Sequence, residues 1–206
     1  MYAISTRLLE KLGQHPWGFK PRLMASFVAQ YGPFPALAWF VRNMPEYERI
    51  LKTQGPIRTH LVSTTASLIN GCPYRTFGHA YALPLHYLKD TGKLFPLSDD
   101  EILALQLLPE EMILEKLELA LDKAGLFEEI AIIKRTGDLI TDEADISKSA
   151  DQHKQDQYIR HLIRMFSKLN ACGIRGNVEP DEAHDPINKD KQLIMQYRQL
   201  RTEQFA

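Results

Sequence analysis

Cys72, Arg75 and His79 follow one another at helical spacing in the stretch NGCPYRTFGHA, residues 70–80. An Asn-Gly turn signal precedes the cysteine and Pro73 favours the first turn of a helix, so we place Cys72 at a helix start. Free backbone N–H groups and the positive end of the helix dipole favour a thiolate there. The charge of Arg75, one turn further on, should lower the thiol pKa further. The pattern therefore predicts a reactive cysteine with a histidine on the same helix face.

The histidine and the cysteine are too far apart to touch, because about 10 Å of helix separates Cys72 from His79. If residues 57–89 form a helical hairpin around the Asn-Gly turn, positions equally distant from the turn face each other. That arrangement places His60 near His79 and predicts a cluster of Cys72, Arg75, His79 and His60. No acidic side chain in this stretch balances the positive charge, so we expect both histidines to stay neutral.

The elements that position this hairpin are expected to be helices. Hydrophobic residues recur at helical spacing almost everywhere and no segment alternates as a strand would, which predicts a single all-α domain over residues 1–206. A capping box at Ser98 and a glycine at position 125 mark helix ends. Pro45 and Gly137 are expected to interrupt helices.

Three further segments complete the expected organisation. The polar stretch 141–150 and the segment 176–186, which contains an acidic tract, are expected to be loops, the acidic tract a solvated one. A long helix starting near Asp151 is expected between them. The last helix, about 189–204, carries one apolar stripe, which packs either on its own core or on a neighbouring subunit.

Composition narrows the function classes. The chain has 206 residues, a net charge of −1 and no sustained basic stretch, so the field that draws proteins to nucleic acid is missing. No apolar run approaches the roughly 20 residues of a membrane span, and the N-terminus has no signal-peptide core. Cys72 and Cys172 are too few for a secreted disulfide framework. We therefore expect a cytoplasmic protein that binds neither nucleic acid nor membranes.

The residues Asn70-Gly71-Cys72-Pro73-Tyr74 and Gly78-His79 resemble the signature of the carboxymuconolactone decarboxylase family, in particular its alkylhydroperoxidase-D-like branch. That signature is a glutamate, eleven residues, then C-x-x-C-x-x-x-H, and the likeness covers about residues 57–89. The resemblance implies an alkylhydroperoxidase-D-like all-α fold that assembles into trimers or hexamers. In the peroxidase branch it also implies a cysteine pair that reduces hydroperoxides while the histidine and glutamate relay protons.

Two of the four motif positions depart from the family. The first motif cysteine falls on Cys72 and the histidine on His79, but Arg75 occupies the second cysteine position and His60 the glutamate position. A dithiol cycle within the motif is therefore excluded. The decarboxylase branch does not depend on the cysteine pair, so a decarboxylase-like function is compatible with the motif.

We consider three functions. The first is an antioxidant, peroxiredoxin-type hydroperoxidase, in which a Cys72 thiolate attacks the peroxide, His79 and His60 assist, and an external thiol restores the cysteine. The second is a cofactor-free enzyme or binder for a small carboxylate, with Arg75 as the clamp because its guanidinium fork matches carboxylates. It predicts a closed pocket beside Cys72. The third is a non-catalytic helical oligomer that retains only the fold.

Cys72, Arg75 and His79 can each also be explained as structural residues without a role in catalysis or binding. Free cysteine is among the most buried residue types, so Cys72 is alternatively a packed apolar residue, with Cys172 a weak candidate for a resolving thiol. Arg75 is alternatively the partner of a structural acid, and His79 a hydrogen-bonded core histidine. Cys72, His79 and His60 are metal-ligand types, but seven residues along one helix is too long for a shared ion. We expect neither a metal nor a cofactor.

Overall fold

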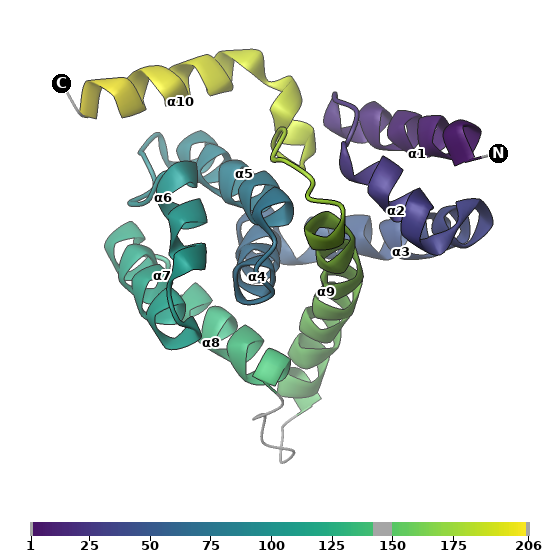
Figure 1. Cartoon of the computed structure of the whole chain (residues 1–206). Coiled ribbons are helices and arrows are strands. Elements are labelled where there is room, and N and C mark those ends of the chain that lie inside the picture. The colour runs from purple at the N-terminus through teal and green to yellow at the C-terminus, as the bar shows by residue number, and fades with distance from the viewer. Residues whose placement is uncertain (1, 142–149, 205–206) are drawn as a thin grey trace.

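The structure is a computed structural model that describes residues 2–141 and 150–204, and all regular secondary structure in that part is helical (Figure 1). The predicted all-α class is thus confirmed. The elements are α1 (Tyr2–Trp17), α2 (Leu23–Tyr31), α3 (Pro33–Gln54), α4 (Pro56–Ile69), α5 (Pro73–Thr91), α6 (Asp99–Ala104), η1 (Leu105–Leu107), α7 (Glu110–Ala124), α8 (Phe127–Thr141), α9 (Ala150–Arg175), η2 (Pro186–Lys189) and α10 (Lys191–Gln204).

The α4–α5 hairpin lies at the centre of the molecule (Figure 1). Every residue of α4 from Thr59 to Leu68 is buried, as expected for a helix with neighbours on all sides. α3, α5, α7, α8 and α9 all contact it. Much of this helix consists of Ser, Thr and Ala, whose small side chains allow neighbouring backbones to approach closely.

Two hydrophobic cores flank the hairpin and a third lies at one end. The first is formed mainly by α1, α2, α3 and α9, and the second by residues of α4 to α8. The third joins α5 to α10 through Leu193, Ile194 and Tyr197. The last helix therefore packs its apolar stripe on its own chain. Its role in an oligomer interface stays a prediction.

The turn of the hairpin ends α4 and begins α5. Gly71 has a φ of +69°, a left-handed conformation that favours glycine. The N–H of Cys72 donates to the carbonyl of Ser67 and that of Gly71 to Leu68, which is the Schellman pattern. Cys72 is the N-cap of α5 and Pro73 its first residue, as the sequence predicted.

The predicted breaks at Pro45 and Gly137 are wrong. Pro45 lies inside α3, and a proline there removes only one backbone hydrogen bond of a helix anchored by buried residues on either side, such as Met44 and Tyr47. Gly137 lies inside α8, where an added Cβ would be 2.9 Å from Leu114 Cδ1. This glycine therefore allows α7 and α8 to pack closely and does not end the helix.

Other boundaries agree with the sequence. The capping box at Ser98 is present, and Gly125 has a left-handed conformation at the end of α7. The helix expected near Asp151 is α9, which begins at Ala150, and most of the predicted loop 141–150 lies outside the described residues. No helix in the described part of the chain is both long and apolar enough to cross a lipid bilayer.

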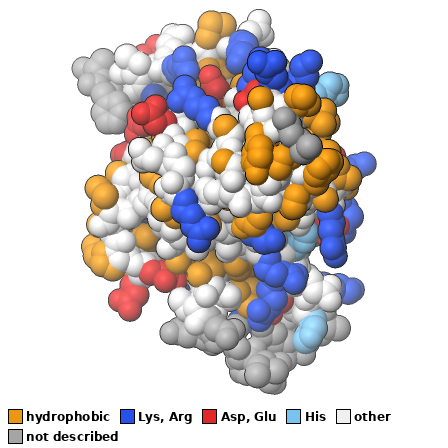
Figure 2. Space-filling view, turned by 45° about the vertical axis from the view of Figure 1, so that its right-hand side comes forward, with side chains coloured by type: hydrophobic (Ala, Val, Ile, Leu, Met, Phe, Trp, Pro, Cys, Tyr) orange, Lys and Arg blue, Asp and Glu red, His pale blue; other side chains and the backbone are white. Residues whose placement is uncertain are grey.

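Large apolar side chains are exposed on the three N-terminal helices. Figure 2 shows hydrophobic side chains gathered on one face and bordered by Lys and Arg. The strongly exposed members on α1 to α3 are Tyr2, Ile4, Phe34 and Val41. An exposed apolar surface of this kind is typical of an interaction site.

Candidate functional site

The hairpin brings His60 and His79 together, as predicted. Nδ1 of His60 lies 3.0 Å from Nδ1 of His79, and both side chains are fully buried. Arg75 lies one turn before His79 on α5, and its NH2 group donates to Nε2 of His79 at 2.8 Å. Three of the four residues of the predicted cluster therefore form one hydrogen-bonded chain.

The protons in this chain have a fixed direction. Arginine has no acceptor, so Nε2 of His79 must accept, and the proton of the neutral imidazole is then on Nδ1. His79 therefore donates to Nδ1 of His60. His60 in turn carries its proton on Nε2 and donates to Oδ2 of Asp185 at 2.9 Å. The order of donation is Arg75, His79, His60, Asp185.

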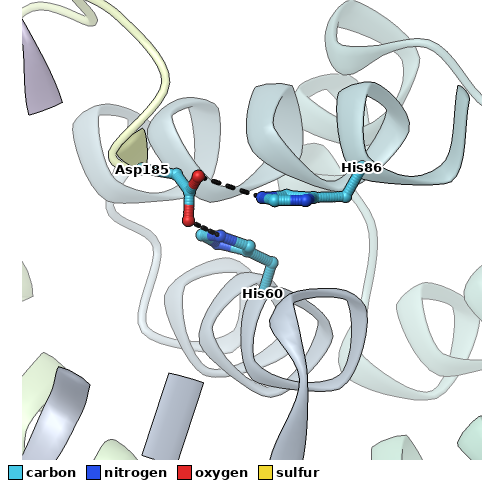
Figure 3. Close-up of side chains that lie close together, drawn as sticks. All are labelled: His60, His86 and Asp185. Atoms are coloured by element: carbon cyan, nitrogen blue, oxygen red, sulfur yellow. Dashed lines mark hydrogen bonds and ion pairs between the residues drawn. The ribbon is translucent and has the colours of Figure 1, made fainter. Parts of the chain in front are cut away.

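Asp185 joins His60 to a third histidine, His86. Nε2 of His86 donates to Oδ1 of the same carboxylate at 2.9 Å. Figure 3 shows the carboxylate between the two imidazoles, with one oxygen toward each ring. The side chain of His86 is 14% exposed, whereas that of His60 is 0% exposed. The chain of hydrogen bonds therefore leads from a buried guanidinium to a side chain that solvent reaches.

A second set of hydrogen bonds starts from the other nitrogen of Arg75. NH1 donates to Nδ1 of His184 at 3.1 Å, and Nε2 of His184 donates to Oδ1 of Asp181 at 3.0 Å. The hydroxyl of Tyr74 donates to the second oxygen of Asp181. Arg75 is thus held by two histidines, and its guanidinium carbon also lies 4.6 Å from the centre of the Phe166 ring.

Gly78 makes room for His184. A Cβ at Gly78 would lie 2.1 Å from Nδ1 of His184, which is inside the ring's van der Waals surface. The N–H of His184 also donates to the carbonyl of Gly78 at 2.9 Å. Only glycine at this position of α5 lets the segment after α9 approach Arg75.

The histidines in this site resist protonation. Burial lowers the pKa of His79 well below its ordinary value, and the nearby Arg75 lowers it further. Burial also lowers the pKa of His60, although hydrogen bonding to Asp185 opposes this effect. Burial lowers the pKa of His184 to about 4. Burial alone would raise the pKa of Asp185, but hydrogen bonds from His60 and His86 hold it well below its usual range. The expectation of neutral histidines agrees with these directions, and Asp185 is the acid that the sequence analysis missed.

Cys72 differs from its prediction. Its side chain is fully buried, and this burial raises the thiol pKa even though the backbone N–H groups of Arg75 and Tyr74 act in the opposite direction. A Cβ at Gly173 of α9 would lie 2.7 Å from Sγ, so α9 covers the sulfur closely. The expected low-pKa thiolate is therefore wrong. Cys172 is also buried and has a pKa raised to about 11, mainly by its burial, and both thiols are free.

A small, mainly apolar cavity lies on the other side of Arg75. It is lined by Trp17, Met24, Phe27, Trp39, Phe40, Met44, Tyr47, Arg75, Met165 and Leu169, and its volume of about 10 Å³ holds roughly one water molecule. Two of its lining residues carry polar atoms that have no hydrogen-bond partner among the described residues. These atoms are the hydroxyl of Tyr47 and Nε of Arg75.

The spacing of His60, His86 and Asp185 also suits a metal, because one ligand atom from each lies within 4.8 Å of the others. Two histidines and a carboxylate form a common iron site. A metal on Nε2 of His60 would displace the proton to Nδ1, which reverses donation to His79. Nε2 of His79 would then carry a proton facing the NH2 donor of Arg75. The direction set by Arg75 therefore favours a hydrogen-bonded relay over a metal centre.

Four residues of this site were not predicted: His86, Asp181, His184 and Asp185. The tract around Asp181 was expected to be solvated, yet the Asp181 side chain is only 6% exposed and is held by His184 and Tyr74. One local signal was present, because Asp185 precedes a proline and caps a short helix by accepting from the N–H of Ile187. It marks a helix start and carries no information about His60.

Comparison with known proteins adds no identification: no family model, no curated protein and no solved structure matches this chain. The fold and the site are therefore interpreted from their own geometry.

Proposed function

We propose that this protein binds a small carboxylate with an apolar body in the cavity beside Arg75, and that the histidine chain holds the guanidinium in position for this ligand. The observation that carries the proposal is the pair of unpartnered polar atoms, Arg75 Nε and Tyr47 OH, on an otherwise apolar cavity. Eleven buried side-chain atoms of the described residues have no hydrogen-bond partner, and these two are the ones whose residues share this cavity.

The charge of Arg75 supports an anionic ligand. Its side chain is 4% exposed, and its partners are two histidines that the direction of donation makes neutral. No carboxylate of the described residues hydrogen-bonds to it. An isolated buried charge is costly unless it is paired, so a ligand carboxylate would provide the missing partner. The guanidinium would also give it the directed hydrogen bonds that carboxylates accept.

Tyr47 supports the same ligand. Burial raises the pKa of its hydroxyl well above the ordinary value, so it stays a phenol and offers an O–H. Arg75 Nε offers an N–H. Two donors and no carboxylate on an apolar cavity suit the two oxygens of an anion better than a neutral hydroperoxide. The aromatic and methionine side chains of the cavity would hold the apolar body.

The histidine chain supports the binding role of Arg75. From His79 the hydrogen bonds lead through His60 and Asp185 to the partly exposed His86, so the guanidinium is held by a continuous set of buried side chains. Arginine keeps its protons, and no histidine of the described residues lines the cavity, so the histidine chain has no route for a proton from a ligand there. We therefore favour a binder of a small carboxylate over an enzyme of proton transfer.

The thiol peroxidase stays a prediction with less support, because Cys72 is buried and has a raised pKa. Three further points stay proposals. They are the relationship to the carboxymuconolactone decarboxylase family, the alkylhydroperoxidase-D-like arrangement of the helices and the cytoplasmic location. The exposed apolar side chains on α1 to α3 favour the predicted homo-oligomer, a trimer or hexamer.

Fluorescence titration tests the proposal, because both tryptophans of the chain, Trp17 and Trp39, line the cavity. We expect benzoate and cyclohexanecarboxylate to change the emission saturably and their methyl esters to do so far more weakly. Arg75→Gln should weaken binding about tenfold to a hundredfold, the range for a charged hydrogen bond. Cys72→Ser should leave binding unchanged. Equal affinity for acids and esters would contradict the proposal. Loss of binding in Cys72→Ser alone would instead support a function of the Cys72 thiol.

A further inference from the structure

The cavity beside Arg75 holds only about one water molecule, so an aromatic carboxylate can enter it only if part of its wall moves. Its wall includes three of the six methionines of the chain, Met24, Met44 and Met165. Methionine is unbranched and repacks at low cost, so a methionine-lined wall can enlarge for a ligand. The question is which part of the wall separates the cavity from solvent.

An open groove between α3 and α9 shares two wall residues with the cavity. The groove has a volume of about 740 Å³ and is lined by Trp39, Arg42, Asn43, Glu46, His161, Ile163, Arg164, Met165, Ser167 and Lys168. Trp39 and Met165 belong to both. Trp39 is half-buried and Met165 is 2% exposed, so these two side chains form the partition between groove and cavity.

The groove is positively charged. Arg42, Arg164 and Lys168 are exposed in it, whereas its only carboxylate, Glu46, is bound to Arg49 at 2.6 Å. The whole chain has a net charge of −1, so this positive surface is a local feature. A groove lined by one sign of charge concentrates ligands of the opposite sign and raises their association rate.

We propose that the α3–α9 groove is the entrance of the cavity for small apolar carboxylates, with Met165 and Trp39 as the movable partition. This inference rests on the proposed function, because it supplies the route by which the anion reaches Arg75. The basic side chains attract the carboxylate, and the methionine side chain changes rotamer to admit the apolar body. The groove thus selects for negative charge before the ligand reaches Arg75.

Stopped-flow tryptophan fluorescence with benzoate tests the entrance separately from the site. In the triple variant Arg42→Gln, Arg164→Gln, Lys168→Gln we expect the association rate at low salt to fall about tenfold, with the dissociation rate unchanged. The loss should disappear at high salt. The matched control neutralises three exposed lysines away from the groove, Lys89, Lys116 and Lys123, and should keep the wild-type rate.

The partition is tested by side-chain size and stiffness. Met165→Ala should raise the association rate about tenfold, because the shorter side chain opens the partition, and should raise the dissociation rate at least as much, because Met165 also lines the cavity. If that variant does not fold, the stiffer Met165→Leu should slow both rates.

The outcomes separate the two proposals. The wild type could bind benzoate saturably while the rates stay the same in the groove variant and in the Met165 variants. That result would contradict the proposed entrance but not the proposed binding site. Equal losses in the groove variant and the lysine control would overturn the entrance as well. Absence of any benzoate binding in the wild type would overturn the proposed function, and the entrance with it.

Discussion

The two sides of Arg75 are built differently. On one side NH1 and NH2 each donate to a histidine, and those histidines are held by Asp181 and, through His60, by Asp185. On the other side Nε has no partner among the described residues and the walls are apolar. We call the first the relay side and the second the cavity side.

This difference indicates which side serves stability and which serves a ligand. Hydrogen bonds on the relay side satisfy buried polar atoms, and breaking them leaves charges without partners. The unpaired groups on the cavity side add nothing to stability, and folded proteins accept such a cost mainly where function needs it. Changes on the relay side should therefore destabilise the protein, whereas removing polar atoms on the cavity side should stabilise it and impair binding.

The largest effect is expected when His184 is displaced from the relay side. Gly78→Ala puts a methyl group where the His184 ring lies, so we expect the free energy of unfolding to fall by about 3 kcal/mol. Gly137→Ala is the control, because its methyl group would meet the end of the Leu114 side chain, at 2.9 Å. Urea unfolding measures both. A loss no greater than that of the control would contradict the fixed position of His184.

The second-largest effect is expected at low pH, where protonation of the relay-side histidines should destabilise the folded protein. His184 has a pKa of about 4 when folded against 6.5 for the free side chain, so the unfolded chain binds the proton more readily. Stability therefore falls as the pH drops through 6.5 toward 4, by about 2 kcal/mol between pH 7 and pH 5 for this residue alone. The lowered pKa values of His60 and His79 act with the same sign.

Unfolding measured against pH checks this prediction. His184→Gln should flatten the slope, because it removes the group whose pKa is lowered on folding. A stability that stays constant from pH 7 to pH 5 would mean that the histidines are not held neutral.

On the cavity side the expected change has the opposite sign. Tyr47→Phe removes a buried hydroxyl without a partner, so the free energy of unfolding should rise by about 1 kcal/mol while benzoate binding weakens. In the control, Tyr87→Phe, the hydroxyl lost donates to the carbonyl of Ala124 at 3.0 Å, and stability should fall by about 1 kcal/mol. Equal losses in the two variants would show that Tyr47 has a partner after all.

The smallest effect is expected at Cys72, which belongs to neither side. Because the thiol is buried and its pKa is raised, iodoacetamide should not modify it in the native protein at pH 8 on the timescale of free cysteine. Mass spectrometry after timed quenching measures this reaction, with urea-unfolded protein as the control. Rapid alkylation of Cys72 at neutral pH would contradict this prediction and would favour the thiol peroxidase over the carboxylate binder.

The local parts of the site could be predicted from the sequence. Helical spacing put Arg75 next to His79, and distance from the turn put His60 opposite it, because both relations depend only on regular geometry. The start of α5 at Cys72 followed from turn and proline chemistry. The burial of Cys72 was one of two alternatives that the sequence left open, and local sequence could not decide between them because the sulfur is covered by α9, about a hundred residues further along the chain.

The rest of the relay depends on an irregular segment. His184 and Asp185 lie between α9 and α10, where no period fixes which side chain faces inward. Their partners, Arg75 and His60, are more than a hundred residues away. The glycine at position 78 that admits His184 had a packing reason visible only in three dimensions.

A crystal structure grown with 4-bromobenzoate tests the central claim most directly, because the anomalous signal of bromine locates the ligand. We predict the carboxylate within about 3 Å of Arg75 Nε and Tyr47 OH, with the bromine between Trp17 and Trp39. A bromine found only outside the cavity, with Arg75 Nε still lacking a ligand, would contradict the account.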